Sequence, residues 1–383
     1  MNRALIIKSF YPELKLVGDS KADDIQLMRT AVGRIGKDME MSCGLAGTVF
    51  RFLALRCSRE KGQHILVGEN RLFERPLTEL MQIFNQLSVK AEIRKLTDNK
   101  SALVIASEGW QLQGNALNVS VKRSSQFASA VLLSAWDLPF KLFIRFDMNQ
   151  VDQMPSFSYY EMTKSLLVNM GMVIKGSGQE IEVPAHQNMN KKVYLVEPDM
   201  STALSIAALG VVGGNATILN FPVDSLQPDY IFPSLLESMG VTTEFKYRNG
   251  ETRLFITAPA PLMGIKVDLK DYPDLFPVLA VLCALAKGKS SLRGAGHLKF
   301  KESDRINKIS ELLNQIGRKH EVFDDGIEIL GEPSEALCHF SYDTDFDHRL
   351  AMAAGVLKLY GHQIDVLNPD VVSKSFPEFW SLM

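Results

Sequence analysis

Cysteine is scarce in this sequence of 383 residues, and the four that occur, Cys43, Cys57, Cys283 and Cys338, lie far apart. None belongs to a CxxC pair or to a Cys/His spacing that a metal would need, so neither a disulfide framework nor a zinc site is supported. A reducing compartment fits this pattern best. Positive charge is not in excess either, because 42 Lys and Arg stand against 44 Asp and Glu. That balance argues against nucleic acid or a membrane surface as a partner.

Long uncharged runs are also lacking. No stretch of the sequence reaches the roughly 18 apolar residues that indicate a transmembrane helix, and the apolar run after Met1 is too short for a signal peptide. The sequence has no GxGxxG after a predicted strand and no GxxxxGK followed by Ser or Thr, so dinucleotide and P-loop nucleotide sites lack support. We therefore expect a cytoplasmic protein whose 46% hydrophobic content fills a sizeable core, in two domains by its length.

An internal repeat dominates what is present. Three Leu-rich helical patterns end at Gly171, Gly240 and Gly317, and each is followed by alternating residues, a turn and more alternating residues. Gly is typical after a helix because it accepts the left-handed backbone conformation there. The turns contain Gly176-Ser177-Gly178, Asn249-Gly250 and Asp325-Gly326, which predict β-hairpins. Weaker copies are expected at 24–36, at 80–90 and, shortened, at 376–383.

A second kind of helix is apolar on nearly every side. We expect it at 4–10, 48–57, 125–135, 201–212, 277–288 and 349–361. A helix without a polar face must be surrounded by protein, so each of these helices is expected in a core. The pattern predicts six related units, each with one buried helix, one amphipathic helix and several strands. Two groups of three such units predict two α/β domains, residues 1–196 and 197–383.

Polar residues gather at the starts of these apolar helices. They are Asn2-Arg3, Gly47-Thr48 with Arg51, Ser124-Ser125-Gln126, Asp199 with Ser201-Thr202, Asp274, and Asp347-His348-Arg349. A helix start presents unpaired N–H groups and partial positive charge, so several converging starts could bind anions. Capping is the more common role for any one such Ser, Thr or Asp. Arg51 and Arg349 lie inside apolar runs, where an unpaired charge is costly, and this favours a ligand for both.

Further charged clusters lie outside the apolar helices. Glu74-Arg75-Pro76 is expected to open a helix with Pro at its first position, residues 299–305 are expected to open an amphipathic helix, and Lys374 lies in an uncharged loop. Together the clusters contain seven cations, Arg3, Arg51, Arg75, Lys301, Arg305, Arg349 and Lys374. The same clusters also contain the possible acid and base groups Asp274, Glu302 and His348. Such a set suits two multiply charged anionic substrates with acid and base groups, and suits hydride transfer poorly. His64, His186, His320, His339 and His362 show no partner pattern and are interpreted as structural or surface residues.

These strings, in this order, resemble the motifs of the EPSP synthase (3-phosphoshikimate 1-carboxyvinyltransferase) family of enolpyruvyl transferases. The matching strings are Gly44-Leu45-Ala46-Gly47-Thr48 with Arg51, Glu74-Arg75-Pro76, Ser124-Ser125-Gln126-Phe127, Lys301-Glu302-Ser303-Asp304-Arg305, Asp347-His348-Arg349 and Lys374-Ser375-Phe376-Pro377. The resemblance implies two inverse α/β-prism domains, each of three βαβαββ repeats, with the active site in the cleft between them. It implies transfer of the enolpyruvyl group of phosphoenolpyruvate to the 5-hydroxyl of shikimate 3-phosphate, through a tetrahedral intermediate. It further implies a monomer that uses no metal or other cofactor in aromatic amino acid biosynthesis.

The resemblance also implies roles for individual residues. The contacts to shikimate 3-phosphate would be Ser124, Ser125, Gln126, Ser156, Tyr159 and Lys301, with Arg3 directed at the carboxylate. The clamp on phosphoenolpyruvate would be Arg75, Arg305, Arg349 and Lys374, with Gly47 and Arg51 beside its phosphate and Thr48 as a further substrate contact. Asp274 would be the base for the attacking hydroxyl, Glu302 would move protons at the methylene carbon, and His348 would support that site. Gly47 would lie where the family's inhibitor glyphosate fits closely.

Some features depart from the family's motifs. The family begins with a strand of the C-terminal domain followed by Lys-Ser and Ser-Asn-Arg, whereas this sequence begins at Met1-Asn2-Arg3. Because that Lys contacts both substrates in the family, an N-terminally truncated, non-catalytic phospho-ligand binder is one alternative. Leu45 stands where many relatives carry Asn, and Lys299 where Arg is common. UDP-N-acetylglucosamine enolpyruvyl transferase is a second alternative, opposed by the lack of a Cys in 62–74.

Overall fold

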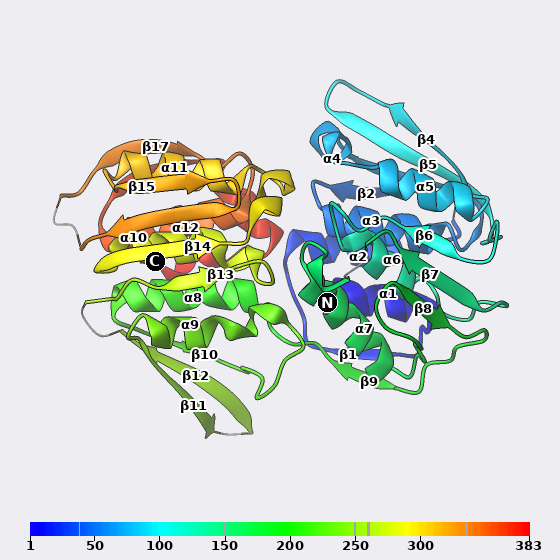
Figure 1. Cartoon of the computed structure of the whole chain (residues 1–383), viewed down its shortest axis with the longest axis horizontal. Helices are drawn as coiled ribbons and strands as arrows, with labels where there is room; N and C mark the ends of the chain where they lie inside the picture. Colours follow the sequence, from blue (N-terminus) through cyan, green and yellow to red (C-terminus); the bar gives the residue numbers. More distant parts are fainter. Residues whose placement is uncertain (38, 149–150, 249, 259–260, 334–335) are drawn as a thin grey trace. The chain divides into compact units, whose positions relative to one another are not determined.

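Two compact units make up the chain in the computed structural model, Met1–Val196 and Glu197–Met383 (Figure 1). The structure describes residues 1–383 apart from 38, 149–150, 249, 259–260 and 334–335. Each unit has its own hydrophobic core, and no residue is shared between the two cores as described.

The first unit mixes helices and strands throughout its described length. Its helices are α1 (Asn2–Phe10), α2 (Asp23–Val32), α3 (Gly47–Cys57), α4 (Asn70–Glu74), α5 (Thr78–Gln86), α6 (Gln126–Leu133) and α7 (Phe157–Asn169), with a 3₁₀ turn η1 (Val151–Gln153). Its strands are β1 (Lys15–Val17), β2 (Glu40–Gly44), β3 (Lys61–Glu69), β4 (Lys90–Lys95), β5 (Lys100–Glu108), β6 (Leu117–Val119), β7 (Leu142–Phe146), β8 (Glu180–Val183) and β9 (Val193–Leu195). The strands form three sheets with the orders β1-β9, β2-β3-β5-β4 and β6-β7-β8.

The second unit has the same mixture. Its helices are α8 (Met200–Gly213), α9 (Phe232–Ser238), α10 (Phe276–Leu285), α11 (Arg305–Gln315) and α12 (His348–Tyr360), with 3₁₀ turns η2 (Pro228–Ile231), η3 (Pro273–Leu275), η4 (Gly296–Phe300), η5 (Pro369–Lys374) and η6 (Phe379–Leu382). Its strands are β10 (Asn215–Ile218), β11 (Thr242–Arg248), β12 (Glu251–Thr257), β13 (Lys266–Asp268), β14 (Gly288–Arg293), β15 (His320–Phe323), β16 (Gly326–Gly331), β17 (His339–Asp343) and β18 (Gln363–Leu367). The sheet orders are β10-β12-β11, β13-β14-β16-β15 and β17-β18.

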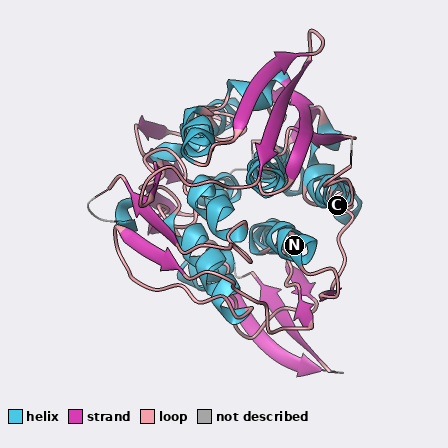
Figure 2. Cartoon of the chain, turned by 90° about the vertical axis from the view of Figure 1, so that its right-hand side faces the viewer, coloured by secondary structure: helices cyan, strands magenta, loops and turns pink. Residues whose placement is uncertain are grey.

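The apolar helices form the centre of each unit. In the first unit α1, α3 and α6 pack on one another, and in the second unit α8, α10 and α12 do so. Every residue of α10 is buried, and α11 by contrast buries one face through Ile306, Ile309 and Leu312. Figure 2 shows helices inside the first unit and strands around its outside. Since fully burying a Leu or Ile side chain contributes about 1.5–3 kcal/mol, these central helices account for much of each core.

The two four-stranded sheets show the repeat most fully. In each, an outer strand pairs in parallel with the next strand, which pairs antiparallel with one strand of a hairpin. The element order β13-α10-β14-α11-β15-β16 is therefore one βαβαββ repeat, and β2-α3-β3-α5-β4-β5 is another with the short α4 added. The described order is shorter in the other parts of the chain, which read α1-β1-α2, β6-α6-β7-α7-β8, α8-β10-α9-β11-β12 and β17-α12-β18.

Several local expectations need correction. Pro76 does not begin a helix, because α4 ends at Glu74 and α5 begins at Thr78. Residues 299–304 lie in η4 and the segment after it, and α11 begins at Arg305 with Asp304 as its cap. The expected helix at 277–288 ends at Leu285, and Gly288 begins β14. Residues 376–383 contain the 3₁₀ turn η6 in place of an α-helix, and the described turn spans four residues, one short turn of chain.

The predicted turns have a mixed outcome. The hairpin at Asp325-Gly326 is confirmed, with Phe323 paired to Gly326 and Asp324-Asp325 at the tip. β11 and β12 also form an antiparallel hairpin, although Asn249 in its turn lies outside the described residues. After Gly176-Ser177-Gly178 the described pairing is one antiparallel bridge, Lys175 to Glu182, where a longer hairpin was expected.

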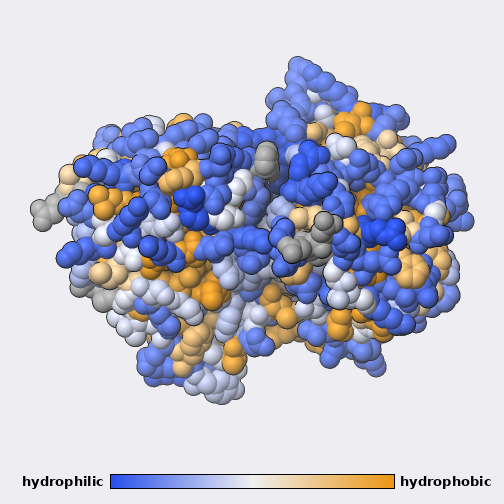
Figure 3. All heavy atoms as spheres, viewed as in Figure 1, coloured by the Kyte–Doolittle hydropathy of each residue, from blue (hydrophilic) through white to orange (hydrophobic). Residues whose placement is uncertain are grey.

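No helix among the described residues is long and apolar enough to cross a membrane. Figure 3 shows one face of the molecule, on which hydrophobic residues are scattered among hydrophilic ones. Scattered apolar residues are normal on a protein surface.

The three glycines expected after helices all have left-handed backbone angles, with φ of 105° at Gly171, 90° at Gly240 and 67° at Gly317. Space around a side chain at Gly317 is open, since no atom lies within 4 Å of a Cβ built there. The need for Gly at this position is therefore a matter of backbone conformation and not of crowding.

We expect Gly317→Ala to lower the free energy of unfolding of the second unit by about 1 kcal/mol, because Ala is strained in this conformation. Gly317→Asn should lose clearly less, since Asn tolerates left-handed angles. Gly33→Ala, at an ordinary helical φ of −68°, is the matched control and should cost little. Urea unfolding of the variants measures the effect, and equal stability of Gly317→Ala and the wild type would contradict it.

Candidate active site

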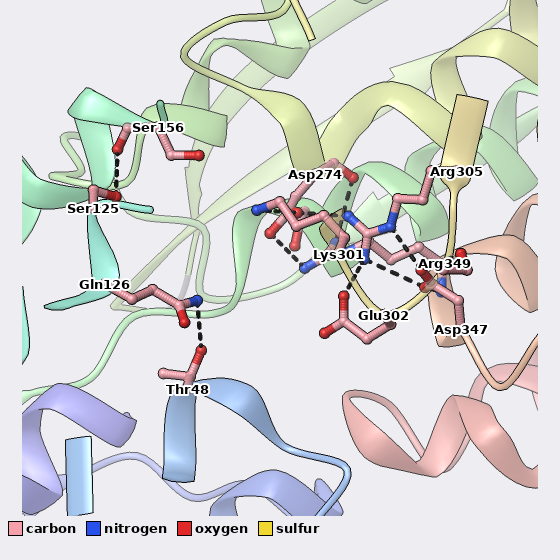
Figure 4. Close-up of polar contacts among 12 residues, drawn as sticks. Thr48, Ser125, Gln126, Ser156, Asp274, Lys301, Glu302, Arg305, Asp347 and Arg349 are labelled. Atoms are coloured by element: carbon pink, nitrogen blue, oxygen red, sulfur yellow. Dashed lines mark hydrogen bonds and ion pairs between the residues drawn. The ribbon is translucent and has the colours of Figure 1, made fainter. Parts of the chain in front are cut away.

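Arg51 is the centre of the first polar cluster in the first unit. It lies on α3, buried, and its Nη1 donates to Oε1 of Gln126 at 2.5 Å. Gln126 begins α6 and donates from Nε2 to Oγ1 of Thr48 at 3.3 Å (Figure 4). The guanidinium also lies 5.2 Å from the ring centre of Phe127, a favourable cation–π contact. The starts of α3 and α6 are thus joined through three polar side chains.

Arg75 lies against Gly47 at the start of α3. A Cβ added to Gly47 would come within 2.4 Å of Arg75 Nη1 and 2.9 Å of its Cζ, so Gly47 leaves room for this guanidinium. Nε and Nη1 of Arg75 are buried and have no hydrogen-bond partner among the described residues. Burying the N–H donors of a cation without partners costs free energy, so this guanidinium is suited to bind an anion.

Ser125 and Ser156 form a second contact in the first unit. The Ser125 hydroxyl donates to the backbone oxygen of Ser156 at 3.0 Å (Figure 4). Ser156 precedes α7 with φ of 56° and ψ of 42°, left-handed angles that cost a non-Gly residue energy. Backbone strain of this kind is frequent at functional sites.

Arg3 lies on α1 and reaches α7. Its Nε donates to Oγ1 of Thr163 at 2.6 Å and its Nη2 to the backbone oxygen of Tyr159 at 3.3 Å. The guanidinium lies 5.4 Å from the ring centre of Phe52. Loss of water lowers the pKa of Arg3 to about 10, so the side chain remains charged at neutral pH. No carboxylate pairs with Arg3 in the part of the chain that the structure describes.

Asp274 is the centre of the polar cluster in the second unit. It lies in η3, ahead of α10, and its carboxylate accepts from Arg305 Nη1 at 2.8 Å and from Arg349 Nη2 at 3.0 Å (Figure 4). Lys301 Nζ lies 3.8 Å away. Burial alone would raise the pKa of Asp274, but Arg349, Lys301 and Arg305 outweigh it and hold the pKa well below its usual range. Asp274 is therefore ionised and acts as an acceptor in this structure.

Arg305 connects the carboxylates of the second unit. It is 1% exposed, and its Nε donates to Oδ2 of Asp347 at 2.7 Å while Nη2 donates to Oε2 of Glu302 at 3.1 Å. Lys374 Nζ donates to Oε1 of the same Glu302 at 3.0 Å. Burial would lower the pKa of Arg305, but Asp347, Glu302 and Asp274 raise it above its ordinary value. One network therefore joins η3, the segment 301–305, α12 and η5.

Asp347 fixes two segments at once. It is fully buried at the start of α12, where its Oδ1 accepts from the backbone N of Arg349 at 3.0 Å. Its Oδ2 accepts from the Ser303 hydroxyl at 3.1 Å as well as from Arg305. This carboxylate caps a helix and holds Arg305 in place.

Two histidines near this network are kept neutral. His348 is buried at the start of α12, and burial together with Arg349 and Lys374 lowers its pKa to about 3. Its Nδ1 has no hydrogen-bond partner among the residues described. His297 in η4 has a pKa of about 3 for a similar reason, burial first and then Lys301. Near neutral pH both rings can donate or accept a hydrogen bond without charge.

The structure refines the expectations about helix starts. Asp199 and Asp347 cap α8 and α12 through their side chains, but Thr48 does not cap α3, and Asp274 lies in η3, before the Leu275 cap position of α10. Ser125 holds the cap position of α6 without a side-chain capping bond. The two arginines that lie inside apolar runs both have partners within the protein. Arg349 forms an ion pair with Asp274, and Arg51 donates a hydrogen bond to the Gln126 amide.

Some residues in these networks were missed from the sequence. Thr163 accepts a hydrogen bond from Arg3 and contacts Ser129 in turn, and His297 lies near Lys301. The position of Thr163, four residues after Tyr159 on one helix, was the available signal, because residues at that spacing share a face.

The comparison with known proteins agrees with the resemblance. The family model of EPSP synthase (3-phosphoshikimate 1-carboxyvinyltransferase) matches residues 14–383. The 3-phosphoshikimate 1-carboxyvinyltransferase of Dehalococcoides mccartyi is 33% identical over 342 residues, which cover 88% of this chain and 76% of the relative. That of Vibrio vulnificus is 28% identical over 407 residues, 99% of this chain and 92% of the relative. The alternative of a UDP-N-acetylglucosamine enolpyruvyl transferase is not favoured.

Solved structures show the same fold. An EPSP synthase from Acinetobacter baumannii superposes with a TM-score of 0.71 at 20% identity, covering 99% of this chain and 92% of that chain. The enolpyruvyl transferase NikO from Streptomyces tendae gives 0.63 at 13% identity, covering 99% and 91%. The expected EPSP synthase-like α/β fold is confirmed. By the extent of the family match and the identity to its relatives, the chain belongs to the EPSP synthase family.

Proposed function

We propose that this chain transfers the enolpyruvyl group of phosphoenolpyruvate to the 5-hydroxyl of shikimate 3-phosphate and releases phosphate. The family match over residues 14–383 supports the reaction class. The observation that carries the proposal is the network of the second unit. In it Asp274 and Glu302 contact three of the cations expected around phosphoenolpyruvate, Arg305, Arg349 and Lys374. Lys301, expected at shikimate 3-phosphate, lies at Asp274 as well. Two multiply charged anions need such a concentration of cations.

The first unit supports binding of the phosphorylated acceptor. In this proposal its contacts are Ser124, Ser125, Gln126, Ser156 and Tyr159, with Arg3 directed at the carboxylate. The free donors of Arg3 suit this role, because neutral groups and a ring are its partners among the described residues. Arg75, with Gly47, Thr48 and Arg51 nearby, would bind the phosphate of phosphoenolpyruvate.

The cations of the second unit are occupied by carboxylates before any substrate binds. Arg305, Arg349 and Lys301 lie around Asp274, and Lys374 lies at Glu302. An incoming phosphate or carboxylate would compete with Asp274 for these cations. As the cations turn to the substrate, the positive field that lowers the pKa of Asp274 weakens, and the carboxylate becomes a stronger base.

The proposed steps use these groups in order. Asp274 takes the proton of the 5-hydroxyl while the hydroxyl oxygen attacks C2 of phosphoenolpyruvate. A proton delivered to C3 completes a tetrahedral adduct. Loss of a proton from the new methyl group and departure of phosphate then restore the double bond. Glu302 would move the proton at C3, and Arg305, Arg349 and Lys374 would stabilise the phosphate that leaves, while Lys301 would contact shikimate 3-phosphate. His348, neutral at pH 7, would support Glu302 without adding charge.

We expect Asp274→Asn and Glu302→Gln each to lower kcat by at least about a hundredfold, the range typical of a lost general base or acid. Phosphate release from phosphoenolpyruvate in the presence of shikimate 3-phosphate measures the activity. Asp98→Asn is the matched control, because this carboxylate is fully exposed on the β4–β5 turn and should leave the rate unchanged.

Calorimetry with shikimate 3-phosphate separates the remaining outcomes. Binding together with phosphate release that both variants abolish supports the proposed enzyme. Binding without phosphate release in the wild type would instead indicate a phospho-ligand binding protein. Absence of both would overturn the proposal.

We expect Gly47→Ala to fold but to bind phosphoenolpyruvate more weakly, because the new methyl group displaces the guanidinium of Arg75. Arg75 is a flexible side chain, so the displacement should raise the KM for phosphoenolpyruvate by about tenfold, the worth of one bond to a charged group. Glyphosate inhibition should weaken more than catalysis. Inhibition constants and KM values measured together test this, and equal losses in both would contradict it.

A further inference from the structure

Thr163 lies where three helices of the first unit meet. Its side chain on α7 is fully buried, at 0% exposure. Its Oγ1 lies 2.6 Å from Nε of Arg3 on α1, 3.1 Å from Oγ of Ser129 on α6, and 2.9 Å from the backbone oxygen of Tyr159. This one hydroxyl therefore connects the predicted ligand of the acceptor's carboxylate to two further helices.

The direction of the hydrogen bond between Arg3 and Thr163 is fixed by chemistry. Nε of Arg3 can only donate, so Oγ1 of Thr163 accepts from it. The one proton of the Thr163 hydroxyl then points to the backbone oxygen of Tyr159 or to Oγ of Ser129, both of which lie within hydrogen-bond distance. The guanidinium consequently meets a group that presents an acceptor to it and has no proton left to turn toward it.

Two nitrogens of the Arg3 guanidinium, Nε and Nη2, are bound by the protein, and Nη1 is available for a ligand. Nε is bound by Thr163, Nη2 contacts the backbone oxygen of Tyr159, and the ring centre of Phe52 lies 5.4 Å from Cζ. A guanidinium has five N–H donors in a rigid fork, so fixing Nε also fixes the direction of the others. Within the described part of the chain, no carboxylate neutralises this charge. The remaining donors are therefore oriented for an anion that the protein does not itself supply.

We propose that Thr163 is a positioning residue that orients Arg3 toward the carboxylate of shikimate 3-phosphate. This inference rests on the proposed function and adds a residue that does not touch the substrate. Thr163 acts through Arg3 by holding Nε and thereby directing the Nη1 edge of the fork. The competing explanation is purely structural, in which Thr163 joins α1, α6 and α7 and has no influence on substrate selection.

The test compares Thr163→Val, which keeps the shape and removes the hydroxyl, with Thr163→Ser, which keeps the hydroxyl. Thr163→Val should raise the KM for shikimate 3-phosphate by about tenfold, the lower range for a hydrogen bond to a charged group. The KM for phosphoenolpyruvate and kcat should change less than about twofold, because the lost bond serves binding of one substrate. Thr163→Ser should restore the wild-type KM.

An altered substrate distinguishes positioning from structural support. Shikimate 3-phosphate whose carboxylate is reduced to a primary alcohol lacks the group that Arg3 would bind. The wild type and Thr163→Val should therefore bind this analogue with nearly equal affinity in calorimetry, although they differ with shikimate 3-phosphate. Thr163→Ala, compared in the same way, carries the test if Thr163→Val does not fold.

Ser58→Ala is the matched control for loss of a buried hydroxyl in the same unit. Ser58 is fully buried and bonded to Leu55 O and Trp110 Nε1, with no contact to Arg3. It should lower the thermal unfolding temperature without changing either KM. An equal loss of affinity for the substrate and its analogue, or no loss for either, would overturn the role of Thr163. Failure of the wild type to bind shikimate 3-phosphate would instead overturn the proposed function.

Discussion

The buried ion pair between Arg305 and Asp347 is the interaction on which the second unit's polar network depends. Both side chains are almost fully buried, and the charges lie 2.7 Å apart. Removing one partner of such a pair costs about 3–5 kcal/mol, because the other charge is left without water. Asp347 also caps α12, so the positions of Arg305 and of the start of that helix are set together. Asp274 and Glu302 are then placed by the remaining donors of the same guanidinium.

The cations with expected substrate roles differ between the two units in whether a carboxylate pairs with them. In the second unit Arg305, Arg349 and Lys374 are already paired with carboxylates. In the first unit Arg3 and Arg75 have no carboxylate partner among the residues described. Binding an anion completes the environment of a first-unit cation, whereas in the second unit an anion must replace a carboxylate. The first unit is therefore suited to hold a ligand, and the second unit to change its own protonation behaviour when a ligand arrives.

Features set by local sequence were predictable, and features set by distant contacts were not. The helix ends at Gly171, Gly240 and Gly317 follow from neighbouring residues alone, and so does burial of helices without a polar face. The partners of Arg51 and Arg349 each lie 75 residues away along the chain, and no local pattern shows them. Thr163 was missed because its spacing from Tyr159 shows only that the two residues share a helix face, whereas its partner Arg3 lies 160 residues away along the chain. The family resemblance supplied the candidate roles, but not these supporting contacts.

The pairing of Asp274 with cations has a consequence for selectivity. A carboxylate held by Arg349, Lys301 and Arg305 is a weak base, so it cannot remove a proton from a hydroxyl while those contacts persist. A neutral ligand offers the cations nothing better than Asp274, so the pKa of Asp274 stays low. A dianion does compete, because a phosphate can accept from several donors at once. The same contacts that hold the unliganded network together would therefore couple proton removal to the presence of an anionic substrate.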